Sequence, residues 1–474
     1  MTVRLLRQFP GDANYPTGLE ANRLYTGPQE EFLILNGAAD RQLELSPDFP
    51  AYYGSTPQPV YSTTRKKNAF ATDDRWGFER GVLPELSRVA THIGQVATAC
   101  LIPNASSTTQ KQANSRSPHW ARDTITALQI VLPGWWVSNV ATATNTEQGI
   151  GSDTTYTASV EYPAGTFTQV TFTGSTSGIA PDGGELVSDM VSVSIPKGQR
   201  FWVRLFVQNA TRIVFTGGGL DVENGAQLAY APSGLSDQTM SGTINNSGAP
   251  TISNGNIITP LAIIATTTMD SLAVIEDSRG QGVGDSYVGI SGDRGNLGRS
   301  VGAFAPYINL GISSERLMWA ITTATKRISL ATRYASRVIV AMGINDITAG
   351  RTNAQIAADE QTLRGLIPMS IPVHICTIEP NTTSTDSWAT TANQTPFAQD
   401  AVRVSVNNRR RNGVANFAST LDLADGVESG RDSGKWDTQY GAPTADGLHA
   451  NRQGYMNIVN NRVVTPAKIN GVAF

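Results

Sequence analysis

A serine, a histidine and an aspartate in the C-terminal half of the chain could together carry out acyl transfer. Ser278 follows the apolar run 272–275, in a turn that would raise its hydroxyl at the end of a strand. Asp446 and His449 are three residues apart, so the carboxylate can hold the imidazole in one tautomer. A serine hydroxyl needs such a base to become a good nucleophile. Each signal is weak alone, because a serine in a turn commonly caps a helix.

Two further positions could stabilise the negative oxygen that forms during acyl transfer. Gly311 would bring a bare backbone N–H close to a substrate, and Asn345 could donate a side-chain N–H. Both have simpler interpretations. Gly311 can be only a turn residue, and Asn345 can cap a helix that begins near Asn353.

The elements that must position these residues are visible as alternating patterns from about residue 269. Short apolar runs predict strands at 272–275, 308–310, 338–342 and 373–378. Between them, apolar residues recur every three or four positions over 315–334 and 355–366, which predicts helices. This alternation favours a parallel sheet covered on both faces. Ligands of such sheets bind beside the carboxyl ends of the strands, where the candidate residues lie.

Residues 89–268 have a different, β-like character and predict a β-sandwich or jelly roll that could bind carbohydrate. Residues 156–162 alternate between apolar and polar, and 191–195 and 201–207 flank Pro-Lys-Gly as a hairpin would. Three tryptophans of this region either pack in a core or form a platform for sugars: Trp135, Trp136 and Trp202. Residues 1–88 contain frequent prolines, which predicts an irregular arm or a small adaptor.

Composition excludes several classes of function. Of the 474 residues, 36 are basic and 39 acidic, a net charge of −3 that gives no reason to expect a nucleic acid or an anionic membrane as partner. Two cysteines and four histidines leave little material for a metal site, so neither metal nor other cofactor is expected. No apolar run approaches the about 20 residues of a membrane span, and the first residues lack a secretory pattern.

Taken together, the strand-end residues resemble the motifs of the SGNH hydrolases, also called the GDSL esterase family. The resemblance covers about 269–474 and consists of Glu-Asp-Ser at 276–278, Asn-Leu-Gly at 309–311, Gly-Ile-Asn at 343–345 and Asp-Gly-Leu-His at 446–449. The family usually has Gly-Asp-Ser where this chain has Glu276. The resemblance implies a three-layer, flavodoxin-like α/β fold with Ser278 as nucleophile, His449 as base and Asp446 as its orienting partner. It also implies an oxyanion hole made by Ser278, Gly311 and Asn345.

The resemblance implies a serine esterase, and the preceding β region favours O-acetyl groups of a polysaccharide as its substrate. Two alternatives stay open. One is a general short- to medium-chain carboxylesterase or lipase acting on small esters. The other is a phage tail-type structural or binding protein with a residual hydrolase fold. An extracellular or virion-associated location is expected, and the oligomeric state is left open.

Three further polar features are expected to be structural. His374 lies within an alternating strand and is expected to be a satisfied core histidine. Cys376 is expected to be a small core residue. The basic run 409–411 is expected to be a solvated helix end.

Overall fold

The computed structural model describes residues 87–139, 144–244, 255–287 and 293–470, and the backbone of three short N-terminal strands. The chain divides into two compact units, residues 1–83 with 460–462 and residues 84–459 with 463–474. In the first unit, β1 (Thr2–Leu5) pairs antiparallel with β2 (Leu24–Thr26) and with β3 (Ala39–Arg41). Most of the predicted arm 1–88 lies outside the described residues.

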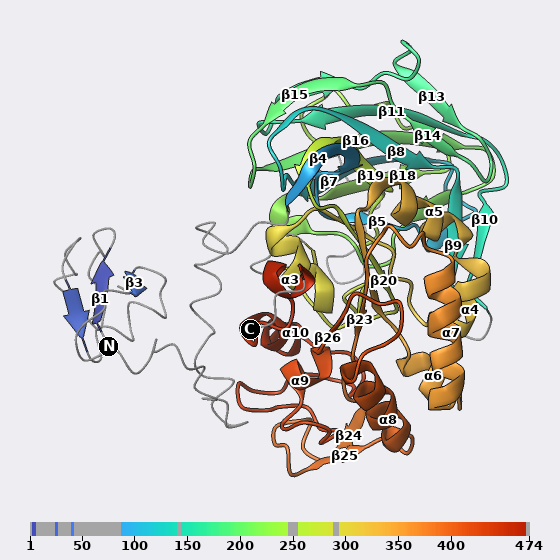
Figure 1. Cartoon of the computed structure of the whole chain (residues 1–474). Helices are drawn as coiled ribbons and strands as arrows, with labels where there is room; N and C mark the ends of the chain where they lie inside the picture. The colour runs from blue at the N-terminus through green and yellow to red at the C-terminus, as the bar shows by residue number, and fades with distance from the viewer. Residues whose placement is uncertain are drawn as a thin grey trace. The chain divides into compact units, whose positions relative to one another are not determined.

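Two antiparallel sheets form the β-rich part of the second unit (Figure 1). The first has the order β12-β11-β16-β7-β18, with β13 also on β11; its strands are β7 (Gln112–Trp120), β11 (Thr154–Glu161), β12 (Phe167–Gln169), β13 (Ser177–Ala180), β16 (Arg200–Asn209) and β18 (Gln227–Ala231). The second has the order β14-β8-β19-β4, with β15 also on β8; its strands are β4 (Ser87–Gln95), β8 (Ile125–Pro133), β14 (Glu185–Val187), β15 (Val191–Ile195) and β19 (Ala262–Met269). Apolar residues of both sheets share one core, as in a sandwich.

In this region the structure contradicts one sequence-based prediction and decides between two others. The predicted hairpin is wrong, because β15 pairs with β8 whereas β16 pairs with β7 and β11, so the turn at 196–198 connects two sheets. The same turn residues suit either connection, so the sequence pattern could not separate them. Trp135, Trp136 and Trp202 are only 0%, 7% and 6% exposed, which supports core packing and contradicts a sugar platform.

The second half of the unit contains the predicted parallel sheet. Its strand order is β26-β23-β22-β20-β21-β5, from strands β5 (Cys100–Leu101), β20 (Leu272–Glu276), β21 (Tyr307–Asn309), β22 (Arg337–Ala341), β23 (Val373–Cys376) and β26 (Ser419–Leu421). Without β5, this is the flavodoxin-like order 2-1-3-4-5, with the change of direction beside β20. The loop after β20 is therefore at the position where open α/β sheets bind their ligands.

Helices contribute apolar residues to the cores on both faces of this sheet. They are α3 (Asn296–Phe304), α4 (Leu317–Thr323), α5 (Thr325–Tyr334), α6 (Ile344–Thr348), α7 (Asn353–Gly365), α8 (Asp400–Arg411), α9 (Leu423–Val427), α10 (Arg452–Asn460) and α11 (Pro466–Ile469). Ala273 and Ile275 of β20 pack in the core of α4 to α8, whereas Leu272 and Val274 pack in the core of α3 and α9 to α11. Among the helices that the structure describes, none has both the length and the apolar character needed to cross a bilayer.

The single helix predicted over 315–334 is instead two helices that meet at Ala324. Ala324 has ψ 36°, which ends α4 and starts α5 in a new direction. The N–H groups of Lys326 and Arg327 donate to the Glu147 carboxylate of the β-sandwich, so a distant residue caps α5 there. The expected solvated end at 409–411 is also wrong, because Arg410 is buried and its guanidinium bonds Glu360.

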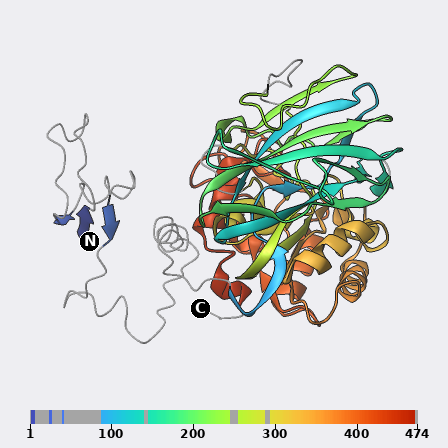
Figure 2. The same ribbon diagram turned by 90° about the horizontal axis from the view of Figure 1, so that it is seen from above.

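The sandwich and the parallel sheet are joined by a strand and by a common core. β5, which lies within the predicted sandwich range, pairs parallel with β21 as the sixth strand of the α/β sheet. Trp135 and Val137 pack in the same apolar cluster as Ile308 of β21 and Ile328 of α5. The predicted boundary at 268/269 falls inside β19. The two views of the molecule show these parts side by side (Figures 1 and 2).

Because the core is shared, Trp135→Ala should destabilise both parts together. Truncating this buried side chain should lower the free energy of unfolding by about 3–5 kcal/mol, in one cooperative transition measured by denaturant or heat. The control is Ile179→Ala, since Ile179 is 57% exposed and should change stability by less than about 0.5 kcal/mol. Two separate transitions, or a Trp135 variant as stable as the control, would contradict the shared core.

Candidate active site

Ser278, His449 and Asp446 form a continuous hydrogen-bonded line. The Ser278 Oγ is 2.8 Å from His449 Nε2, and His449 Nδ1 is 2.7 Å from an Asp446 carboxylate oxygen. Ser278 is buried to 8% exposure, whereas the Asp446 side chain is about half exposed. Residues that are 171 positions apart in the sequence thus meet at the carboxyl end of β20.

The charge state of Asp446 determines which histidine nitrogen carries the proton. Burial pushes the pKa of Asp446 upward, but hydrogen bonds from His449 and from the Leu448 N–H outweigh burial, so the pKa lies below its ordinary value. Asp446 is therefore ionised near neutral pH and can only accept hydrogen bonds. It accepts from His449 Nδ1, which leaves Nε2 of the neutral ring free to accept the hydroxyl proton of Ser278.

The turn after β20 places Ser278 through its own backbone contacts. Asp277 accepts the Arg279 N–H on its carboxylate at 3.0 Å and the Gly280 N–H on its carbonyl at 3.1 Å. Burial raises the pKa of Asp277 to about 6, and the Arg279 charge offsets part of that rise. The turn directs the side chain of Ser278, which lies between Asp277 and Arg279, toward His449.

Glu276, where the resembled family usually has glycine, is a buried acid directly beneath this turn. Its carboxylate lies close to the Asn296 side chain, whose N–H donates to Glu379 at 2.7 Å. Burial, reinforced by the charges of Asp277 and Glu379, raises the pKa of Glu276 well above its ordinary value. Burial therefore disfavours the charged form of Glu276 below the candidate nucleophile.

Arg279 connects the serine turn to the histidine turn. Its Nε donates to the Leu448 carbonyl at 3.1 Å, one residue before His449. One terminal nitrogen pairs with the Glu379 carboxylate at 2.9 Å, and the other donates to the Pro380 carbonyl at 2.8 Å. Both partners of the ion pair are buried, so losing either one would leave an uncompensated charge. The Arg279 guanidinium thereby joins the serine turn to the histidine turn and to the loop at 379–380.

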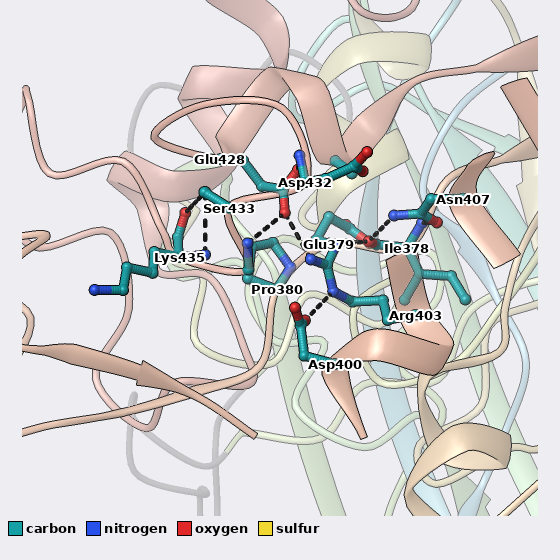
Figure 3. Close-up of polar contacts among 12 residues, drawn as sticks. Ile378, Glu379, Pro380, Asp400, Arg403, Asn407, Glu428, Asp432, Ser433 and Lys435 are labelled. Atoms are coloured by element: carbon teal, nitrogen blue, oxygen red, sulfur yellow. Dashed lines mark hydrogen bonds and ion pairs between the residues drawn. The ribbon is translucent and has the colours of Figure 1, made fainter. Parts of the chain in front are cut away.

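A second buried arginine supports the loop that carries Glu379 (Figure 3). Arg403 of α8 donates to the Ile378 carbonyl at 3.0 Å and to Glu428 at 2.7 Å, with Asp400 at 2.6 Å on its Nε. The Asn407 side chain both donates to the Ile378 carbonyl and accepts the Ile378 N–H. Residues of α8 therefore hold the loop that carries Glu379, the ion-pair partner of Arg279.

The turn that carries His449 depends on Gly447. Gly447 has φ +80°, and a Cβ placed there would lie 1.7 Å from the Thr382 carbonyl oxygen. Its own carbonyl accepts Trp436 Nε1–H at 2.8 Å and the Thr382 N–H at 3.1 Å. The Thr444 hydroxyl accepts the Gly447 N–H at 2.9 Å and donates to the His449 carbonyl. The sequence motif Asp-Gly-Leu-His is thus held in one conformation from both sides.

Gly311 lies against the serine turn, and among the described contacts neither Gly311 nor Asn345 is hydrogen-bonded to Ser278, His449 or Asp446. The Gly311 N–H already donates to the Asn309 side chain at 3.0 Å, which argues against Gly311 as a free donor. The N–H of Ser314, at φ +61°, has no hydrogen-bond partner in the described residues and was not singled out from the sequence. Asn345 directs one N–H to the Glu315 carbonyl at 2.9 Å, which leaves its second N–H available.

The remaining polar expectations have mixed outcomes. Asn345 does not cap α7, because Thr352 does so through a capping box with Gln355. His374 is buried and bonds the Ser419 hydroxyl at 2.8 Å, but its Nε2 has no partner in the described region, and burial lowers its pKa to about 4. Cys376 is a free, buried thiol in the core, as expected. Within the described ranges, His, Cys, Asp and Glu form no group of three or more that could hold a metal ion.

No protein-family model matches the chain, and no curated protein matches it. Among solved structures, a GDSL-like lipase from Bacteroides thetaiotaomicron is 16% identical at a TM-score of 0.31, covering 43% of this chain and 89% of its own. A lipolytic G-D-S-L family protein from Veillonella parvula is 17% identical at 0.27, covering 40% and 94%. A catalytic mutant of an acetylxylan esterase from Geobacillus stearothermophilus is 14% identical at 0.28, covering 40% and 91%. TM-scores at this level do not establish a family for the whole chain.

Substituting Gly447 should damage the fold around the histidine turn. Gly447→Ala forces a Cβ against the Thr382 carbonyl, whereas Gly350→Ala has a similar φ of +84° and nothing within 4 Å. Both variants carry the left-handed strain of about 1 kcal/mol, and the clash should cost Gly447→Ala about 1–3 kcal/mol more in unfolding free energy. Equal midpoints of thermal unfolding for the two variants would contradict the assigned constraint.

Proposed function

We propose that this protein is a serine hydrolase of carboxylic esters. The observation that carries the proposal is the line from Ser278 through His449 to an ionised Asp446, with both hydrogen bonds shorter than 3 Å. This arrangement supplies a nucleophile, a base and a group that orients the base.

The proposed mechanism follows from these contacts. Ser278 Oγ attacks the ester carbonyl carbon while His449 Nε2 takes the hydroxyl proton, and the carbonyl electrons move to the oxygen. Collapse of the tetrahedral intermediate breaks the bond to the alcohol, which receives that proton from His449. Water then attacks the acyl-enzyme in the same way and regenerates Ser278. Asp446 stabilises the transient imidazolium without becoming protonated.

Stabilisation of the negative oxygen is proposed for three N–H groups near the serine turn. These are the Ser278 N–H, the second side-chain N–H of Asn345 and a backbone N–H of the loop after β21. In that loop Gly311 lies against the serine turn, and in this structure its N–H donates to the Asn309 side chain. Each such donor contributes about 3–4 kcal/mol of transition-state stabilisation in serine hydrolases.

For the substrate, we propose an O-acetyl group on a polysaccharide. A β-sandwich packed onto the hydrolase half supports this choice, because it extends the protein surface beyond what a small ester requires. Among the described residues, the exposed large apolar side chain that is closest to Ser278 along the sequence is that of Val283, with an exposed fraction of 37%. A lipase entrance would need a wider apolar surface.

Replacing the nucleophile tests the reaction class. Ser278→Ala should remain folded and lose about 10⁴- to 10⁶-fold in kcat on p-nitrophenyl acetate, because the other two residues act only through the serine. The control is Ser329→Ala, a serine on the exposed side of α5. If folded Ser278→Ala keeps more than about a tenth of the wild-type kcat, the nucleophile is misassigned.

The length of the acyl chain tests the substrate class. Among p-nitrophenyl esters of two, four, eight and sixteen carbons, kcat/KM should be greatest for acetate, and acetylated xylan should release acetate. In an apolar groove, each buried methylene would instead favour binding by about 0.8 kcal/mol, or about fourfold. A maximum at eight carbons or more would support a lipase, and no hydrolysis of any ester would support a structural or binding protein.

A further inference from the structure

The β-rich region reaches the α/β half through a separate two-stranded sheet, the hairpin of β9 (Trp135–Ser138) and β10 (Thr146–Gly149). Asn145, immediately before β10, is fully buried, and its side-chain Nδ2 donates to the Ser313 carbonyl at 3.2 Å. Ser313 belongs to the segment between β21 and α4, residues 311–316, which we call the 311–316 loop. Figure 1 places β10 beside α5, which follows α4.

A second contact from the same hairpin reaches the loop through a buried arginine. The Glu147 carboxylate accepts Arg327 Nε–H at 2.9 Å and two backbone N–H groups at the start of α5. Another nitrogen of Arg327 lies 2.7 Å from the Glu315 carboxylate, and all three side chains are at most 3% exposed. Burial raises the pKa of Glu315, and the Arg327 charge opposes that rise. The positive charge of Arg327 therefore pairs with two carboxylates, that of Glu147 from the β-rich region and that of Glu315 from the α/β region.

The other side of the 311–316 loop contacts Gln281, in the segment that follows Ser278, and Asn345. The Ser313 N–H and hydroxyl both donate to the Gln281 side-chain oxygen, at 2.9 and 2.5 Å, and Gln281 is three residues after Ser278. The Glu315 carbonyl accepts the Asn345 side chain at 2.9 Å. The loop thus connects the β9–β10 hairpin with Asn345, and it also contains the backbone N–H proposed to stabilise the oxyanion.

We propose that Asn145 and Glu147, at the β9–β10 hairpin of the β-rich region, are positioning residues of the active site, which hold the 311–316 loop in register with Ser278 and Asn345. The inference rests on the proposed esterase function and goes beyond it, because it makes the sandwich part of the catalytic apparatus. Without the Asn145 N–H, the part-buried Ser313 carbonyl loses a hydrogen-bond donor and the loop can shift. A shift of about 1 Å in a catalytic group can reduce turnover about a hundredfold.

The deciding experiment compares steady-state kinetics of the full chain and of its Asn145→Ala, Asn145→Asp and Glu147→Gln variants on p-nitrophenyl acetate. Asn145→Ala should reduce kcat about ten- to a hundredfold with KM changed less than about threefold, because the oxyanion forms only in the transition state. Asn145→Asp should be at least as impaired, since it places a carboxylate against a carbonyl. Glu147→Gln keeps an acceptor for Arg327 and should lose less than Asn145→Asp.

The matched control is Glu185→Gln, which removes another ion pair between the sandwich and α5. Glu185 pairs with Arg333 at 2.5 Å, at a more exposed position that does not contact the 311–316 loop. Its kcat should stay within about twofold of wild type, as expected for an exposed pair.

Hydrogen exchange separates failure of this inference from failure of the proposed function. In Asn145→Ala, amides of 311–316 should exchange faster than in wild type and in Glu185→Gln, whether or not an ester is turned over. Wild-type hydrolysis with unchanged kcat in all three hairpin variants would overturn the inference. A change confined to KM, or global unfolding of every hairpin variant, would overturn it too, because the contacts would then serve binding or folding alone. If the wild type hydrolyses no ester but the 311–316 amides of Asn145→Ala still exchange faster, the esterase proposal fails, whereas the contact between the hairpin and the loop is supported.

Discussion

The guanidinium of Arg279 is the group around which the candidate site is assembled. It follows Ser278 in the chain, donates to the residue before His449 and pairs with Glu379, which α8 supports through Arg403. A buried ion pair adds little net stability over an apolar pair, but removing one partner is strongly unfavourable. The geometry between the serine and histidine turns is consequently set by charge compensation as well as by the sheet.

The second organising constraint is the common core of sandwich and α/β sheet. β5 contributes two residues to the sheet, and Trp135 fills space between the β-sandwich and α5. An edge strand such as β21 would otherwise present unpaired backbone groups, and β5 satisfies part of that edge. The sandwich is therefore structurally integral to the α/β half, and the ion pairs of Arg327 add a polar contact across the same boundary.

The sequence predicted the parts of the fold and of the site that depend on local patterns. Short apolar runs gave the parallel strands and placed Ser278 at the carboxyl edge of the sheet, whereas the pairing of Ser278 with His449 came from the resemblance to the SGNH hydrolases. Contacts between distant residues were not predictable. The burial of Arg410 depends on Glu360, fifty residues away, and the hydrogen bond that occupies Gly311 depends on how the Asn309 side chain turns. β5 is too short to show any periodicity.

The pairing of β5 with β21 also has a consequence for how the chain reaches its native state. Cys100 pairs with Ile308, so more than 200 residues must be synthesised after β5 before its partner exists. Contacts of such long sequence separation slow folding, because the loop between them must close first. During translation the sandwich would emerge with one short strand unpaired and with Trp135 lacking its partners from α5. A nascent chain halted before α5 would thus expose apolar surface, which makes this stage the natural point for chaperone binding or aggregation.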